Sequence, residues 1–233
     1  MVIEFLYSDL YLYGDEGNVR YLRECVPDAR LVFTEWGNRP YFADSRPDLL
    51  YMGSMSEKNL VRTAEELAPF AGRLAELRDD GAVMLFTGNA VNLLGAEVRC
   101  GDKSDRMLGL YPFGVGEDFF DRYNSPVLGS CDGLEVIGFS HRFDNFTAAP
   151  EKPFMTVENG RGCMKGCALE GVHDNNLFAT YTLGPLLVMN PLFTERLLGL
   201  AGSDCGAAFG SVAEANYRKK LAEFKERPGA FHE

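Results

Sequence analysis

The stretch LFTGNAVNLLG, at residues 85–95, has the form of an apolar strand that turns sharply into a helix. In α/β enzymes such a turn often presents a nucleophile, because the residue at its tip is held exposed at the end of the sheet. Here the tip is Gly88 followed by Asn89, and the only hydroxyl at the turn belongs to Thr87. The chain therefore has a turn suited to nucleophilic chemistry that carries no cysteine or serine.

A second set of candidate groups surrounds His141 in GFSHRFDN, where Arg142 and Asp144 follow an apolar run. An imidazole in this place suits a general base or a substrate contact, because it exchanges its proton near neutral pH. A histidine that is simply hydrogen-bonded at a strand end is an equally good interpretation. His232 lies in the C-terminal tail, where we expect it to be solvated.

The turn GDEGN (14–18) places Asp15 and Asn18 between an expected strand and an expected helix. Its backbone amides suit an anion or a carboxylate, but an ordinary helix-entry turn is the favoured interpretation. The dinucleotide fingerprint is absent, and GAEVRCGDKS (95–104) lacks the spacing of a P-loop. We therefore expect no ATP site of that type and no cofactor in this chain.

The loop CMKGC (163–167) pairs two cysteines in a glycine-rich setting and is the candidate for a metal site. Structural zinc usually needs four ligands, and His173 is the only imidazole close to this loop in the sequence. The ligand count therefore favours two free thiols and no metal.

The composition fits a globular protein, since 46% of the 233 residues are hydrophobic and 24% are charged. The formal net charge of −11 argues against nucleic acid and anionic lipid as partners, because an acidic surface repels phosphate. No apolar run approaches the roughly 20 residues of a membrane span, and the N-terminus lacks the basic start of a signal peptide. A chain of this length needs no disulfide to hold its core, so reduced cysteines and a cytoplasmic location are expected.

The elements that must position these groups follow an α/β pattern. Apolar and β-branched runs predict strands at 2–7, 31–36, 48–54 and 83–87. Helices are predicted at 19–26 and 57–79, and Pro69 should kink or divide the second one. This order indicates a parallel sheet covered by helices on both faces.

The second half of the chain has a different sequence pattern. From near residue 108, short apolar runs alternate with Gly, Asp, Asn and Pro, which predicts antiparallel strands and hairpins that extend the sheet. We expect one more strand within 177–187, a helix at 191–200, and a C-terminal helix at 211–227 with Ser211 as its N-cap. Because no repeat or clear linker interrupts the chain, residues 1–233 are expected to form a single domain.

Three stretches carry a family resemblance by their order and spacing. They are LYLYGDEGNVRYL (10–22), DLLYMGS (48–54) followed by VMLFTGNAVNLLG (83–95), and FATYTLGPLLVMNP (178–191). Together they resemble the glutamine amidotransferase domain of the cobyric acid synthase type. The closest similarity is to the glutaminase subunits that pair with a Mur-ligase-like partner to amidate lipid II. GLEVIGFSHR (133–142) is a weaker match to the same family.

The resemblance implies a flavodoxin-like class I amidotransferase fold, a three-layer sandwich with a mostly parallel sheet and an antiparallel extension. In active relatives an elbow cysteine attacks the glutamine amide, a histidine on a later strand moves the protons, and backbone amides hold the oxyanion. The cysteine position aligns with Gly88 and the histidine position with Leu183, so neither catalytic side chain is expected here. The oxyanion-type amides, expected near Gly53 and Asn89, do not depend on those side chains.

Several functions remain open at this stage. The first is a non-hydrolytic binding or regulatory subunit of an ATP-dependent, Mur-ligase-like amidating ligase. Such a subunit would hold a small amide or amino acid at Gly53, Ser54, Gly88, Asn89, His141 and Arg142. The second is an enzyme with different chemistry in the same crevice, using Asp15, Asn89, His141, Arg142 or Asp144. The others are a structural subunit with a filled pocket, and an active glutaminase that uses unrecognised residues in cell-wall or corrinoid amidation.

Overall fold

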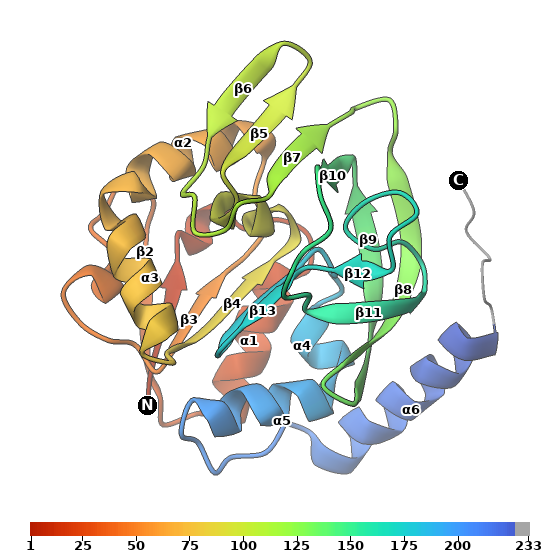
Figure 1. Ribbon diagram of the computed structural model, residues 1–233. Coiled ribbons are helices and arrows are strands. Elements are labelled where there is room, and N and C mark those ends of the chain that lie inside the picture. The colour runs from red at the N-terminus through yellow and green to blue at the C-terminus, as the bar shows by residue number, and fades with distance from the viewer. Residues whose placement is uncertain (227–233) are drawn as a thin grey trace.

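The computed structural model describes residues 1–226, so the expectation for His232 lies outside the described residues. At its centre is a six-stranded sheet in the order β13-β14-β4-β3-β1-β2 (Figure 1). Its strands are β1 (Val2–Leu6), β2 (Arg30–Thr34), β3 (Leu49–Met52), β4 (Val83–Thr87), β13 (Val172–Asp174) and β14 (Leu177–Thr180). All neighbouring pairs are parallel except β13 and β14, which form an antiparallel hairpin. The predicted α/β class with a mostly parallel sheet is therefore confirmed.

Helices cover both faces of this sheet, as the alternation of apolar residues requires. Leu50 and Met52 of β3 belong to the core beneath one helical layer, whereas Leu49 and Tyr51 belong to the core beneath the other. The first layer holds α2 (Glu57–Leu67) and α3 (Ala71–Asp79), and the second holds α1 (Asp15–Cys25), α4 (Leu186–Met189) and α5 (Pro191–Leu200). The three-layer arrangement is therefore present.

The helix boundaries bear out one expectation and correct two. A short 3₁₀ turn, Ala68–Phe70, contains Pro69 and separates α2 from α3, because proline cannot donate to the helical ladder. Helix α1 begins at Asp15, four residues before the predicted start. Helix α6 (Gly210–Glu226) begins before Ser211, so that residue lies in the first turn and the predicted N-cap is wrong.

The strands between residues 97 and 170 do not extend the central sheet, and one pair among them is parallel, so that prediction is wrong except for β13. They form two separate four-stranded sheets, in the orders β10-β7-β5-β6 and β12-β11-β8-β9. The first contains β5 (Glu97–Cys100), β6 (Lys103–Arg106), β7 (Gly114–Glu117) and β10 (Asp144–Phe146). The second contains β8 (Tyr123–Cys131), β9 (Leu134–Arg142), β11 (Met155–Asn159) and β12 (Leu169–Glu170). The hairpin of β13 and β14 forms one edge of the central sheet, and neither of the other two sheets pairs with it in the part of the chain that the structure describes.

Across residues 1–226, none of the helices combines the length and the apolar character that crossing a membrane requires.

Candidate functional site at the strand-to-helix turn

The turn after β4 has the shape of an elbow, but it continues as a 3₁₀ helix, η4 (Gly88–Leu94), rather than an α-helix. Gly88 has a φ of 59°, in the left-handed region where a side chain is strained. A Cβ atom built on Gly88 would lie 2.6 Å from the Cβ of Ser54 and 3.0 Å from Cδ2 of Leu183. Packing and backbone conformation therefore both require glycine here. Gly88 and Leu183 are neighbours, as the family resemblance requires.

The Asn89 side chain ties the elbow to the segment that follows β3. Its Oδ1 accepts from the backbone amide of Met55 at 2.9 Å, and its Nδ2 donates to the carbonyl of Met55 at 2.7 Å. The amide of Ser54, next along the chain, donates to Oδ2 of Asp15 at 2.6 Å. Two backbone amides near the expected oxyanion site are therefore already occupied by side chains of the protein itself.

Asp15 is buried beneath the elbow and acts there as a shared acceptor. Its carboxylate accepts from the hydroxyls of Tyr51 at 2.6 Å, Ser54 at 2.5 Å and Thr87 at 2.7 Å. Asn18 joins the same network through the Tyr51 hydroxyl, and its Oδ1 accepts from the amide of Leu187. Asp15 and Asn18 contact β3, β4 and the start of α4. These contacts favour the interpretation of GDEGN as an ordinary helix-entry turn over ligand binding.

A pocket beside the elbow has a volume of only about 20 Å³, room for about one water molecule. It brings together most of the sequence-predicted residues, and Gly53, Asp15 and Asn18 are not in its lining. The residues that line it are Tyr13, Ser54, Glu57, Gly88, Asn89, His141, Arg142, Phe143, Asp144, Tyr181 and Leu183. No cysteine is among them, so none of the six free thiols reaches the elbow.

His141 and Arg142 both reach this pocket from the end of β9, but they differ in exposure and in hydrogen bonding. His141 is exposed, and its ring lies against that of Tyr13 with centroids 5.5 Å apart. Arg142 is buried and donates to the carbonyls of Asp144, Gly162 and Cys163. Its guanidinium thus holds the CMKGC loop in place, which leaves His141 as the more accessible of the two for a ligand.

A hydrogen-bonded chain of polar side chains forms the back of the pocket. The Tyr181 hydroxyl donates to Oδ1 of Asn92 at 2.5 Å, and Nδ2 of Asn92 donates to Asp144 at 2.8 Å. Burial raises the pKa of Asp144 above its ordinary value. Burial also raises the pKa of Glu117 to about 7, with the charges of Asp144 and Glu57 adding to the effect. These groups make the surroundings of the elbow acidic.

Sequence reasoning missed Tyr13, Glu57 and Glu117 in this neighbourhood. Glu57 could have been predicted from the sequence, because it follows Ser56, a residue type that often caps a helix after a strand end. In the structure Ser56 is the N-cap of α2 and accepts from the Asn59 amide. No sequence pattern indicated Glu117, because it is placed opposite Asp144 by the pairing of β7 with β10. His173 lies away from the CMKGC loop, with its ring stacked on Phe178 at 4.4 Å.

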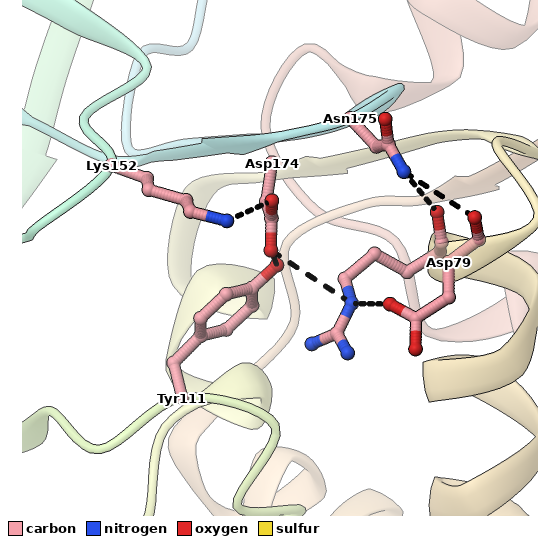
Figure 2. Close-up of polar contacts among 6 residues, drawn as sticks. Asp79, Tyr111, Lys152, Asp174 and Asn175 are labelled. Carbon is pink, nitrogen blue, oxygen red and sulfur yellow. Dashed lines mark hydrogen bonds and ion pairs between the residues drawn. The ribbon is translucent and has the colours of Figure 1, made fainter.

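A second and much larger cavity, of about 690 Å³, lies beside the amino-terminal ends of β4 and β14. It is lined by Arg78, Asp79, Leu110, Tyr111, Pro112, Phe113, Ala148, Ala149, Pro150, Glu151, Lys152, Val172, Asp174 and Asn175. Figure 2 shows how its charged groups are arranged around Asp174. Asp174 binds the ammonium of Lys152 and accepts from the Tyr111 hydroxyl at 3.2 Å, while Nε of Arg78 lies 2.8 Å from Asp79. Both cations are therefore paired with carboxylates of the protein.

Two known proteins are similar to most of this chain. No protein-family model matches the chain. The chain is 25% identical over 215 residues to the lipid II isoglutaminyl synthase (glutamine-hydrolyzing) subunit GatD of Staphylococcus aureus, covering 89% of this chain and 86% of that protein. The GatD subunit of Streptococcus pneumoniae is also 25% identical, over 210 residues, with coverages of 85% and 79%.

Solved structures show the same architecture. A crystal structure of a glutamine amidotransferase matches 87% of this chain and all of its own length, with a TM-score of 0.53 at 15% identity. The PurLQS structure from Thermotoga maritima covers 94% of this chain, with a TM-score of 0.54 at 10% identity. This chain has a glutamine amidotransferase-like fold. At these identities the solved structures bear on the fold alone, so the activity must be argued from the site.

Proposed function

We propose that this chain is a glutamine amidotransferase-like subunit of an ATP-dependent amidating ligase and that it releases no ammonia from glutamine by the Cys–His route. The observation that carries the proposal is the contact between Gly88 and Leu183 at the elbow. These are the positions that the resemblance assigns to nucleophile and base, and they lie side by side without a thiol or an imidazole. Because neither catalytic group works without the other, their joint absence argues strongly against that chemistry.

The two relatives named as lipid II isoglutaminyl synthase subunits support cell-wall amidation as the pathway. A Mur-ligase-like enzyme is the partner that this pathway implies. Assignment to the cobyric acid synthase type, and with it corrinoid amidation, has only the motif similarity behind it. A cytoplasmic location fits the six free thiols.

The size of the elbow pocket favours a regulatory or scaffolding role over ligand capture. A volume of about 20 Å³ accommodates no amino acid, and the side chains of Arg142 and Asn89 donate to backbone carbonyls of the protein. A small amide would enter only if Leu183 or His141 moved aside. The main contribution of this subunit is therefore to organise its ligase partner.

The direct test combines the purified chain with the ligase that co-purifies with it, ATP, and either glutamine or ammonium as the nitrogen source. We expect amidated product with ammonium and none with glutamine, and we expect faster amidation than by the ligase alone. Ammonia release from glutamine at an enzyme-like rate, unaffected by Cys100→Ala, would overturn the non-hydrolytic part. A ligase that neither binds the chain nor responds to it would overturn the subunit part.

A restored site provides a second test, and the structure shows how to build it. Gly88→Cys with Leu183→His places the new Cβ 2.6 Å from that of Ser54, so this double variant should be destabilised. Adding Ser54→Gly removes the clash, and we expect the triple variant to be the more stable and to release ammonia from glutamine. Ser54→Gly alone is the matched control and should remain inactive. A double variant as stable as the wild type would contradict the contact itself.

A further inference from the structure

Cys131, Asp132 and His173 come together at the end of the β8–β9 hairpin that lies away from His141. One ligand atom from each, the thiol sulfur, a carboxylate oxygen and a ring nitrogen, lies within 4.8 Å of the other two. Nδ1 of His173 is 3.4 Å from Oδ2 of Asp132. Neither the resemblance nor the proposed function uses these three residues.

The β8–β9 turn positions Cys131 and Asp132, and strand pairing with ring stacking positions His173. Cys131 ends β8, and the turn residues Asp132 and Gly133 both have positive φ, which brings the strand directly back as β9. His173 sits on β13 opposite Phe178, and the stacked rings keep the imidazole in one plane. Its neighbour Asp174 points into the large cavity (Figure 2), and alternate residues of a strand face opposite sides. His173 is therefore directed away from that cavity.

We propose that Cys131, Asp132 and His173 bind a divalent cation of the zinc type, with solvent in the fourth position. Sulfur, nitrogen and oxygen donors together match the borderline character of zinc, and three protein ligands with an open position are a known arrangement. Tetrahedral zinc with these donors needs ligand atoms about 3.3–3.6 Å apart. The Nδ1 to Oδ2 separation already has this value, and one ligand atom from each of the three residues lies within 4.8 Å of the other two. The cation can enter beside Asp132, whose side chain is 42% exposed.

Two features of this site shape how a cation would bind. Arg196 lies 2.6 Å from Oδ2 of Asp132, so its guanidinium competes with a cation for the carboxylate. Burial raises the pKa of the Cys131 thiol to about 12, so the thiol keeps its proton at neutral pH. Formation of the metal–sulfur bond then releases that proton to solvent, and the metal charge stabilises the thiolate.

The test is a titration of the intact, metal-free protein with Zn²⁺ by calorimetry and with Co²⁺ by absorption spectroscopy. We expect one equivalent to bind and the Co²⁺ complex to show a thiolate charge-transfer band. Cys131→Ser should remove the band, and His173→Gln and Asp132→Asn should each weaken binding at least about tenfold. Arg196→Gln should strengthen binding, because it removes the competing charge.

Matched controls separate this site from the other thiols and from misfolding. Cys205→Ser removes an exposed thiol, and Cys167→Ser removes one from the CMKGC loop, so both should bind as the wild type does. Asp132→Asn suits the backbone, because asparagine tolerates the left-handed conformation, and thermal melting checks that each variant is folded. Binding without a thiolate band, or binding lost in Cys167→Ser and kept in Cys131→Ser, would overturn the proposal.

Discussion

The hollow at the carboxyl ends of the central strands and the hollow at their amino ends differ greatly. The first, beside the elbow, has a volume of about 20 Å³, and the second has about 690 Å³. In open α/β sheets the crevice at the carboxyl ends is the usual ligand site. In this chain that crevice is closed by its own residues, whereas the larger space lies at the opposite end.

The difference between the two hollows comes from how their polar groups are used. At the elbow, the buried carboxylate of Asp15 and the side chain of Asn89 join β3, β4 and the loops after them. At the amino ends, Asp174 and Lys152 form an ion pair at the surface, with the lysine largely exposed. Polar groups at the elbow therefore stabilise the fold, and those around the large cavity contribute little.

Asp15→Ala should lower the free energy of unfolding by about 4 kcal/mol, because it leaves several buried donors without the carboxylate that now accepts their hydrogen bonds. Urea denaturation followed by circular dichroism measures this loss. Glu16→Ala is the matched control, since its exposed pair with Arg20 should contribute less than about 1 kcal/mol. Equal losses of unfolding free energy in the two variants would contradict the stabilising role of the buried polar groups at the elbow.

Gly88→Ala should cost about 3 kcal/mol, the sum of left-handed strain and the clash with Ser54. Gly101 has nearly the same φ, 58°, and nothing within 4 Å of a built Cβ. Gly101→Ala should therefore cost only the strain, about 1 kcal/mol. Repeating Gly88→Ala in a Ser54→Gly background should recover the difference between the two. A Gly88→Ala loss no larger than that of Gly101→Ala would show that the elbow is not tightly packed.

Glu170 makes the carboxyl end of β14 sensitive to pH. Its buried carboxyl group accepts from the Thr180 hydroxyl and the Tyr181 amide, and burial raises its pKa to about 7. Because the folded-state pKa lies above the unfolded value, the unfolded chain loses this proton first as the pH rises. The stabilisation is therefore present below about pH 4.5 and is lost by about pH 7, on the order of 2–3 kcal/mol.

Glu170→Gln should flatten the fall in unfolding free energy between these pH values, as measured by urea titrations at each pH. Glu117→Gln should also flatten part of this fall, because the pKa of Glu117 is raised to about 7 as well. A stability that rises between pH 4.5 and 7 in the wild type and is unchanged in Glu170→Gln would refute this account.

Asp174→Asn should change the free energy of unfolding by only about 1 kcal/mol, because Lys152 is largely exposed and Arg78 keeps its pair with Asp79. Lys152→Ala should cost less still. Both are read from the same urea denaturation as the elbow variants. A loss comparable to that of Asp15→Ala would mean that the amino-end cavity is as integral to the fold as the elbow.

Much of the architecture could be read from local patterns in the sequence. The apolar runs at 83–87 and 48–54 and the break at Pro69 depend on neighbours within a few residues, so they were predicted correctly. The grouping of the later strands depends on which partner each strand finds, and there the prediction failed. Glu4 illustrates the same limit, since its place in an apolar run is explained only by donors from Thr34, Tyr41 and Phe42.

For the candidate site, the position of the elbow and the glycine at its tip could be predicted from residues 83–95, because strand, turn and Leu-Leu-Gly are contiguous there. The folded structure was needed to show that Ser54 and Leu183 fill the space in front of Gly88 and that Arg142 is bound to backbone carbonyls. It also decided that Cys131 meets His173. The physical reason is that burial and hydrogen-bond satisfaction depend on residues far apart in the chain, which no local pattern records.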